Sequence, residues 1–160
     1  MKLYGPGEAA PNARRILAAL GRHGVDYLLI GGFAVNAHGY PRLTRDVDIL
    51  VPLDKENFAR LAEAIADLGS DDELAPATWR SGDATRFDTH QGVLRVHRSI
   101  DGLRAGYDEL GERAIEADVG DLRVKVIGYD DLIRIKRAAG RPHDLADIAA
   151  LEDARGPAAT

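Results

Sequence analysis

Two aspartates separated by one residue, Asp46 and Asp48, are the residues of this chain best suited to chemistry. They lie in segment 46–51, which is apolar enough to form a buried strand. Side chains alternate across a strand, so both carboxylates project from one face while Val47 and Ile49 project into a core. Two ionised carboxylates repel each other unless a cation lies between them, and such oxygen ligands suit Mg²⁺ or Mn²⁺. The spacing therefore predicts a metal site; the alternative is an edge strand with ordinary surface acids.

Gly31 and Gly32 precede this strand and end the apolar run 25–30, which has the length of a buried strand. Glycines lack a Cβ atom and let the backbone approach a ligand closely. A helix that starts near Phe33 would add free N–H groups for an anion. The pair therefore predicts a ligand-binding turn, and the alternative is a plain turn between a strand and a helix.

Arg42 and Thr44 are in phase with the acidic pair if the extended conformation begins just after Pro41. One face of the strand would then carry a guanidinium for phosphate, a hydroxyl and two carboxylates in a row. We expect this to be the catalytic face.

The residue pattern resembles the signature of nucleotidyltransferases of the DNA polymerase beta superfamily: Gly31-Gly32, then Arg42, Thr44, Asp46 and Asp48. The closer resemblance is to the minimal nucleotidyltransferases and the AbiEii-like toxin-associated proteins, and segment 136–148 resembles the family's C-terminal stretch. The resemblance implies Mg²⁺-dependent transfer of a nucleoside monophosphate from a nucleoside triphosphate to a hydroxyl of RNA, protein or a small molecule. It also implies a cognate toxin or antitoxin protein as partner.

The resemblance implies a third carboxylate on a neighbouring strand, which completes a site for two metal ions and assists deprotonation of the acceptor. When the chain is aligned on residues 100–102, this position falls on Arg95. A guanidinium cannot bind a cation, so Arg95 would pair with an aspartate or a phosphate and oppose a second metal ion. The alternative function is thus a degenerate, catalytically weak module that binds a nucleotide or a partner. Asp88, Asp101 or His97 are the candidate substitutes, and a wrong alignment would leave Arg95 exposed and far from the site.

Lys136 is the remaining candidate site residue. The resemblance implies that it connects the C-terminal helices to the nucleotide. The alternative is an ion-pair network with Arg141, Asp144 and Asp147 that locks a helical hairpin. His143 stands where the family has a lysine, which weakens such a lock at neutral pH.

The composition sets broad limits on the protein class. A chain of 160 residues suits one domain, expected over 1–154 with a frayed tail at 155–160. The absence of cysteine excludes disulfides, thiolate ligands and a cysteine nucleophile, and fits a reducing cytoplasm. A net charge of −5 argues against charge-driven coating of nucleic acid. No signal peptide or membrane span is visible in the sequence, so we expect a cytoplasmic protein without a membrane partner.

Hydrophobic periodicity predicts an α/β fold with a short mixed sheet, covered by helices on one face and carrying the function on the other, and a C-terminal helical pair. Helices are expected at 11–23, from 33, after Asp54, and at 107–117, 129–139 and 142–152. Strands are expected at 25–30, 46–51, 85–90, 93–98 and 122–127, the third and fourth forming a hairpin. Segment 70–82, around Trp79, is rich in turn-forming residues.

Overall fold

The computed structural model describes residues 11–52, 54–70, 84–100, 103 and 105–156. The helices are α1 (Pro11–Arg22), α2 (Gly31–Ala37), α3 (Lys55–Asp67), α4 (Tyr107–Glu112), α5 (Tyr129–Ala139) and α6 (Pro142–Arg155). The strands are β1 (Leu28–Ile30), β2 (Val47–Leu50), β3 (Thr85–Thr89), β4 (Gly92–His97), β5 (Ile115–Val119) and β6 (Leu122–Val126). Among these elements, no helix has both the length and the apolar character needed to cross a bilayer.

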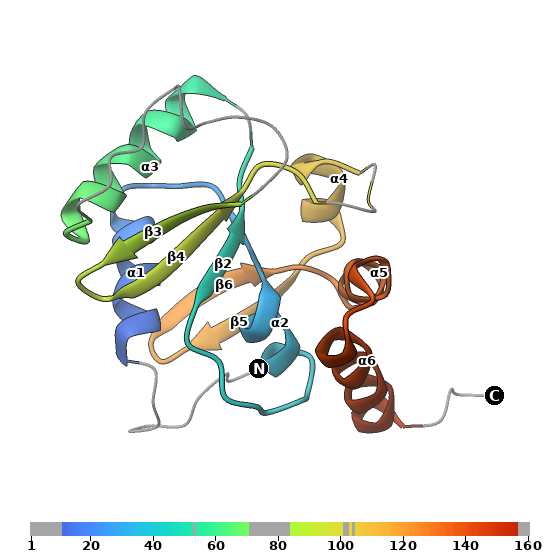
Figure 1. Ribbon diagram of the computed structural model, residues 1–160. Helices are drawn as coiled ribbons and strands as arrows, with labels where there is room; N and C mark the ends of the chain where they lie inside the picture. Colours follow the sequence, from blue (N-terminus) through green and yellow to red (C-terminus); the bar gives the residue numbers. More distant parts are fainter. Residues whose placement is uncertain (1–10, 53, 71–83, 101–102, 104, 157–160) are drawn as a thin grey trace.

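A six-stranded mixed sheet with the order β3-β4-β2-β1-β6-β5 forms the centre of the fold (Figure 1). β2 pairs antiparallel with β1 and parallel with β4, and β1 also pairs parallel with β6. An antiparallel hairpin forms each edge, β3 with β4 and β5 with β6. The strand of the acidic pair is therefore central, with a paired strand on each side.

Helices cover one face of this sheet. α1 lies behind the sheet in Figure 1 and packs against α3, β4 and β6. Val47 and Ile49 point into this layer and are completely buried, as the alternation along β2 predicts. α3 begins as expected after Asp54, whose side chain accepts a hydrogen bond from the backbone N–H of Asn57 at 2.7 Å.

The α5–α6 hairpin lies at the side of the sheet next to α2 (Figure 1). His38, directly after α2, donates a hydrogen bond from Nε2 to the Ile127 carbonyl at 2.7 Å, and its ring meets that of Tyr129 edge-on. Burial, aided by the nearby charge of Arg155, lowers the pKa of His38 from its ordinary value of 6.5. These contacts attach α2 to the start of α5.

The α/β fold with a mixed sheet and a C-terminal helical pair is confirmed, but one predicted helix is wrong. α4 ends at Glu112, and the second half of the predicted helix 107–117 belongs to β5 instead. Ala117 and Val119 are buried, whereas Glu116 is exposed and Asp118 is half-buried, which is the period of a strand. Glu and Ala favour helices locally, and pairing with β6 overrides that preference.

The C-terminal helix is longer than predicted. α6 continues past the expected end at residue 152 to Arg155, whose guanidinium lies 4.0 Å from the centre of the Tyr129 ring. A cation over an aromatic face stabilises this last turn. The expected frayed tail therefore does not include Arg155, and its residues 157–160, like nearly all of the turn-rich segment 70–82, lie outside the described residues.

Candidate functional site

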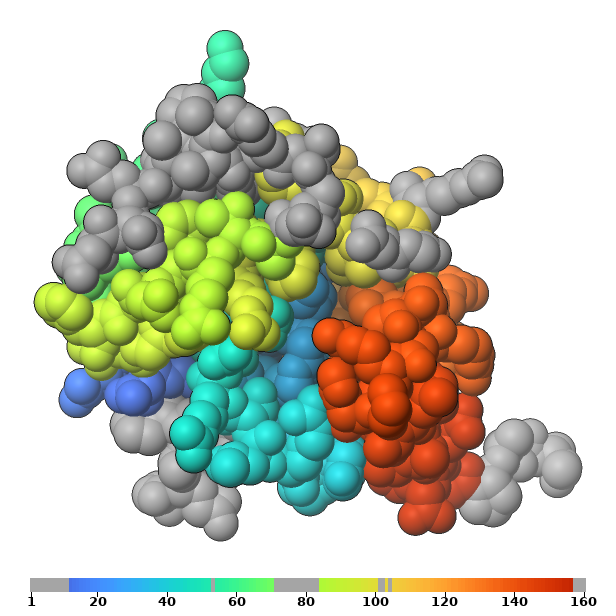
Figure 2. Space-filling view, viewed as in Figure 1, coloured from blue at the N-terminus to red at the C-terminus, as the bar shows by residue number. Residues whose placement is uncertain are grey.

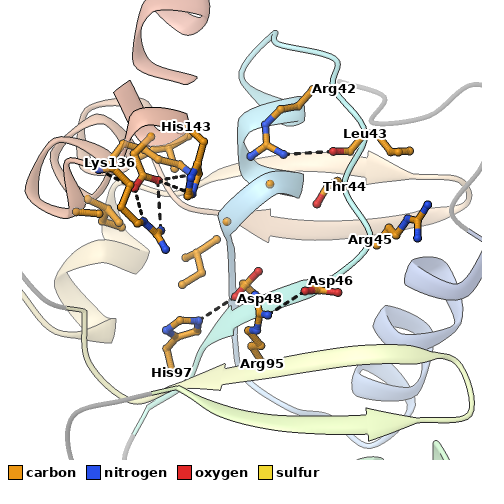
Figure 3. A pocket seen from close by; sticks show the side chains of 18 residues that line it. Arg42, Leu43, Thr44, Arg45, Asp46, Asp48, Arg95, His97, Lys136 and His143 are labelled. Carbon is orange, nitrogen blue, oxygen red and sulfur yellow. Dashed lines mark hydrogen bonds and ion pairs between the residues drawn. The ribbon is translucent and has the colours of Figure 1, made fainter. Parts of the chain in front are cut away.

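A cavity of about 490 Å³ opens between β2 and β4, the loop before β2, and the α5–α6 hairpin. The surface is hollowed between these segments in Figure 2, and Figure 3 shows the lining side chains. All of the residues predicted from sequence line it: Gly31, Gly32, Arg42, Thr44, Asp46, Asp48, Arg95 and Lys136. The structure thus brings together residues from both halves of the chain.

Each carboxylate of the acidic pair contacts a basic side chain of β4. The parallel pairing of β2 with β4 places Asp48 opposite Arg95, and the guanidinium reaches Asp46 with 3.1 Å between Nη2 and Oδ2. His97, two residues further on the same face, places Nε2 at 3.1 Å from Oδ1 of Asp48. An ionised carboxylate can only accept, so Nε2 of His97 donates this bond. Figure 3 shows both contacts side by side.

The structure describes two of the three candidate substitutes for a third carboxylate, and they differ in whether they reach the acidic pair. His97 is the one that reaches the acidic pair. Asp88 lies on the edge strand β3, where it is exposed and pairs with Arg86, and it does not line the cavity. Asp101 lies outside the described residues. Arg95 is therefore beside the acidic pair, as the alignment predicts, and not an isolated surface residue.

The two glycines are required by close contacts with the acidic strand and its loop. Gly31 has a φ of +71°, and a Cβ atom there would lie 2.7 Å from Oδ2 of Asp48. A Cβ atom on Gly32 would collide with the hydroxyl of Thr44 and lie 2.8 Å from its Cβ. The hydroxyl of Thr44 thus stands where a side chain at position 32 would begin. α2 starts at Gly31 itself, two residues earlier than expected.

β2 begins only at Val47, and the residues from Tyr40 to Asp46 form a loop. Side chains nevertheless alternate along this loop: Leu43 and Arg45 are exposed, whereas Arg42 and Thr44 are half-buried like the acidic pair. Arg42 and Thr44 therefore line the cavity, as expected. The guanidinium of Arg42 binds both carboxylate oxygens of Asp147 on α6, at 2.8 and 3.0 Å. Arg42 therefore anchors the loop to the C-terminal hairpin.

Lys136 is buried at the cavity wall and lies between two buried carboxylates. Its ammonium is 3.0 Å from Asp147 and 3.4 Å from Asp144. Arg141 adds a 2.6 Å hydrogen bond to Asp144. Burial alone would raise the pKa of Asp144, but the Arg141 hydrogen bond and the Lys136 charge hold it below its ordinary value. The predicted ion-pair network is therefore present, and it extends to Arg42 in the loop before β2.

Sequence reasoning did not name Arg45, which lies at the rim of the cavity. Its side chain is exposed and points away from Thr44 and Asp46 across the loop, as strict alternation predicts (Figure 3). It forms no ion pair with any residue that the structure describes. Its neighbour Leu43, 78% exposed, also lies at this rim.

The donor set does not fit two divalent ions. Within the described residues, no group of three His, Asp or Glu side chains has the arrangement of a metal site. The third position holds Arg95, whose positive charge beside Asp46 would repel a divalent ion bound there. Asp46 and Asp48 are the carboxylates that could hold one ion, and Arg95 and His97 would compete with it for them.

Comparison with solved structures places this geometry in a known fold. The chain matches the lincosamide antibiotic adenylyltransferase LnuA with lincomycin bound, at a TM-score of 0.66 and 18% identity over 89% of this chain and 96% of that one. The chain shares the fold of this adenylyltransferase. The antibiotic-resistance factor ANT(2'')-Ia in solution matches at a TM-score of 0.60 and 18% identity, over 91% and 83% of the two chains. ANT(2'')-Ia in complex with adenylyl-2''-tobramycin matches at 0.58 and 17%, over 90% and 87%.

Sequence comparison adds nothing to this likeness in structure. The chain matches no protein-family model and no curated protein sequence. At these identities the structural likeness supports the polymerase-beta-like nucleotidyltransferase fold alone. The assignment to the AbiEii-like branch is not supported by these neighbours.

Proposed function

We propose that this chain binds a nucleoside triphosphate in the cavity and transfers its nucleotidyl group slowly to a hydroxyl acceptor. The observation that carries this proposal is the convergence of the acidic pair, the glycine turn and basic side chains from three segments on one cavity of about 490 Å³. A cavity of this size fits a small ligand of nucleotide dimensions.

The reaction would form a bond between the acceptor oxygen and the α-phosphorus and break the bond from that phosphorus to the bridging oxygen, releasing pyrophosphate. The protein's part is to orient the triphosphate and the hydroxyl and to accept the hydroxyl proton. Asp46 and Asp48 are the carboxylates in position to accept it, and both already receive hydrogen bonds or ion pairs from β4. General-base assistance is typically worth about 10²- to 10⁴-fold in rate, so a base weakened in this way implies slow transfer.

We also propose that the acceptor is a small molecule. The likeness to LnuA with bound lincomycin and to ANT(2'')-Ia with adenylyl-2''-tobramycin supports a small-molecule hydroxyl ahead of RNA or protein. A role beside a toxin or antitoxin protein stays a prediction, as does an Mg²⁺ or Mn²⁺ ion held by Asp46 and Asp48.

The second candidate function is that of an antitoxin-like regulator, which binds a nucleotide but does not transfer it. The contacts of Arg95 with Asp46 and of His97 with Asp48 favour it, because they occupy both carboxylates.

Transfer of label from α-³²P nucleoside triphosphates to aminoglycosides, lincosamides, RNA and the protein itself tests the proposal. We expect weak label transfer in wild type and stronger transfer in Arg95→Asp with Mg²⁺ present, because three carboxylates would then face one another. Vigorous wild-type transfer that drops in Arg95→Asp would show that Arg95 serves the triphosphate during the reaction. Nucleotide binding with no transfer by either protein would favour the regulator, and absence of nucleotide binding would refute both functions.

A further inference from the structure

The cavity has a positive local charge in a chain whose net charge is −5. Its lining includes the positive side chains Arg42, Arg45, Arg95, Lys136 and Arg141, against the carboxylates Asp46, Asp48 and Asp144. Fixed positive charge in a cavity attracts polyanions and favours their binding. Contacts within the protein determine which of these charges remain available to a ligand.

The charges on the α5–α6 side of the cavity are largely offset, because three cations contact two carboxylates. Lys136, Arg42 and Arg141 contact Asp144 and Asp147, and both of these carboxylates are buried. Lys136 is itself buried, so a ligand could reach its ammonium only by breaking the network that joins the hairpin to the loop. Arg141 is exposed and keeps N–H donors beyond its contact with Asp144.

The charges on the β4 side are arranged differently. Arg95 contacts Asp46 through Nη2, at 3.1 Å, and its side chain is 39% exposed. A guanidinium has five N–H donors, so Arg95 can neutralise Asp46 and still donate to a phosphate. His97 donates a hydrogen bond from Nε2 to Oδ1 of Asp48. Arg45 at the cavity rim has no ion-pair partner within the described part of the chain.

We propose that this cavity binds the phosphates of a nucleoside triphosphate without a divalent ion, because Arg95 is a built-in counter-charge to Asp46, His97 donates a hydrogen bond to Asp48, and Arg45 adds an exposed cation at the rim. The proposal rests on the proposed function, since it specifies the form of nucleotide that the same cavity takes. In the absence of these two β4 side chains, paired carboxylates would repel a triphosphate and a metal ion would have to bridge them.

Calorimetric titration of wild-type protein with ATP, GTP, CTP and UTP, and with inorganic tripolyphosphate, tests the inference in excess EDTA and in excess Mg²⁺. The metal-free nucleotide carries more negative charge than its Mg²⁺ complex. It should therefore bind at least as tightly in EDTA as in Mg²⁺. Binding about tenfold tighter or more in Mg²⁺ than in EDTA would overturn the inference while leaving the proposed function intact. Absence of binding in both conditions would overturn the proposed function and this inference together.

Substitutions of the arginines that remain available to a ligand test where the phosphates bind. Arg45→Ala should weaken binding about tenfold in both conditions, the effect of one charge-assisted hydrogen bond. Arg95→Asp should lose binding in EDTA by about the same factor or more and recover it with Mg²⁺. Arg95→Gln, which keeps a similar size, should bind nucleotide more weakly in EDTA and should not regain affinity with Mg²⁺. It replaces Arg95→Asp in the test if that variant does not fold. Unchanged affinity in EDTA for all three variants would refute the assignment.

Arg123 offers a matched control. It is an exposed arginine on β6, paired with Glu116 and outside the cavity lining. Arg123→Ala removes one positive charge from the same sheet but away from β4, so it should leave nucleotide affinity in EDTA unchanged. A loss equal to that of Arg45→Ala would mean that binding reflects the general charge of the surface, and it would refute a defined site.

Discussion

Removing the charge of Lys136 should cost folding stability and leave nucleotide affinity nearly unchanged. Lys136 is 7% exposed, and its ammonium lies 3.0 Å from Asp147 and 3.4 Å from Asp144, which are themselves 3% and 1% exposed. Lys136→Met keeps the length of the side chain but leaves two buried carboxylates short of one cation. Each carboxylate retains an arginine, so the loss should lie at the lower end of the range for a broken buried ion pair, about 3 kcal/mol.

For a chain of this size, a loss of about 3 kcal/mol lowers the melting temperature by about 6–12 °C. Thermal and urea unfolding followed by circular dichroism measure it, and calorimetry with ATP should show an affinity within about threefold of wild type, under 1 kcal/mol. Arg137→Ala is the matched control, because Arg137 lies next to Lys136 on α5 but is exposed and pairs with Glu152 at 3.6 Å. Its loss should be below about 1 kcal/mol. An unchanged melting temperature for Lys136→Met, together with a more than tenfold loss of ATP affinity, would refute the structural role and assign the ammonium to the triphosphate.

Two further predictions concern the packing of α2. Gly32→Ala should destabilise the fold by about 1–3 kcal/mol in urea unfolding, because the new Cβ meets the side chain of Thr44, and most of this penalty should vanish in a Thr44→Gly background. An equal penalty in both backgrounds would mean that another contact excludes the side chain. Because the pKa of His38 is lowered in the folded protein, the unfolded chain binds the proton more readily below pH 6.5, and stability should fall as pH drops from about 7.5 to about 5.5. His38→Gln should flatten this dependence of the melting temperature on pH; an identical slope in the variant would assign the effect to other groups.

The sequence determined the parts of this protein that follow from local periodicity. The period of two along residues 46–51 was sufficient to place Asp46 and Asp48 on one face and Val47 in the core. The hairpin of β3 and β4 and the helices α5 and α6 were likewise predictable, because their apolar residues repeat with the period of the element and glycine or proline marks their ends. The proximity of Arg95 to the acidic pair could be expected only through resemblance to a family, and the parallel pairing of β2 with β4 agrees with it.

Only the tertiary structure decided how the site residues meet. Arg42, expected to guide phosphate, lies on the expected side of the loop but binds Asp147 of α6. This contact joins two segments more than a hundred residues apart, so no local pattern predicts it. The segment of β5 was misread for a related reason, since its alternation is short and its helix-forming residues are overruled by pairing with β6. A local pattern specifies which face of an element a side chain occupies, whereas the residue it meets depends on strand order and loop packing, which are set by contacts far apart in the chain.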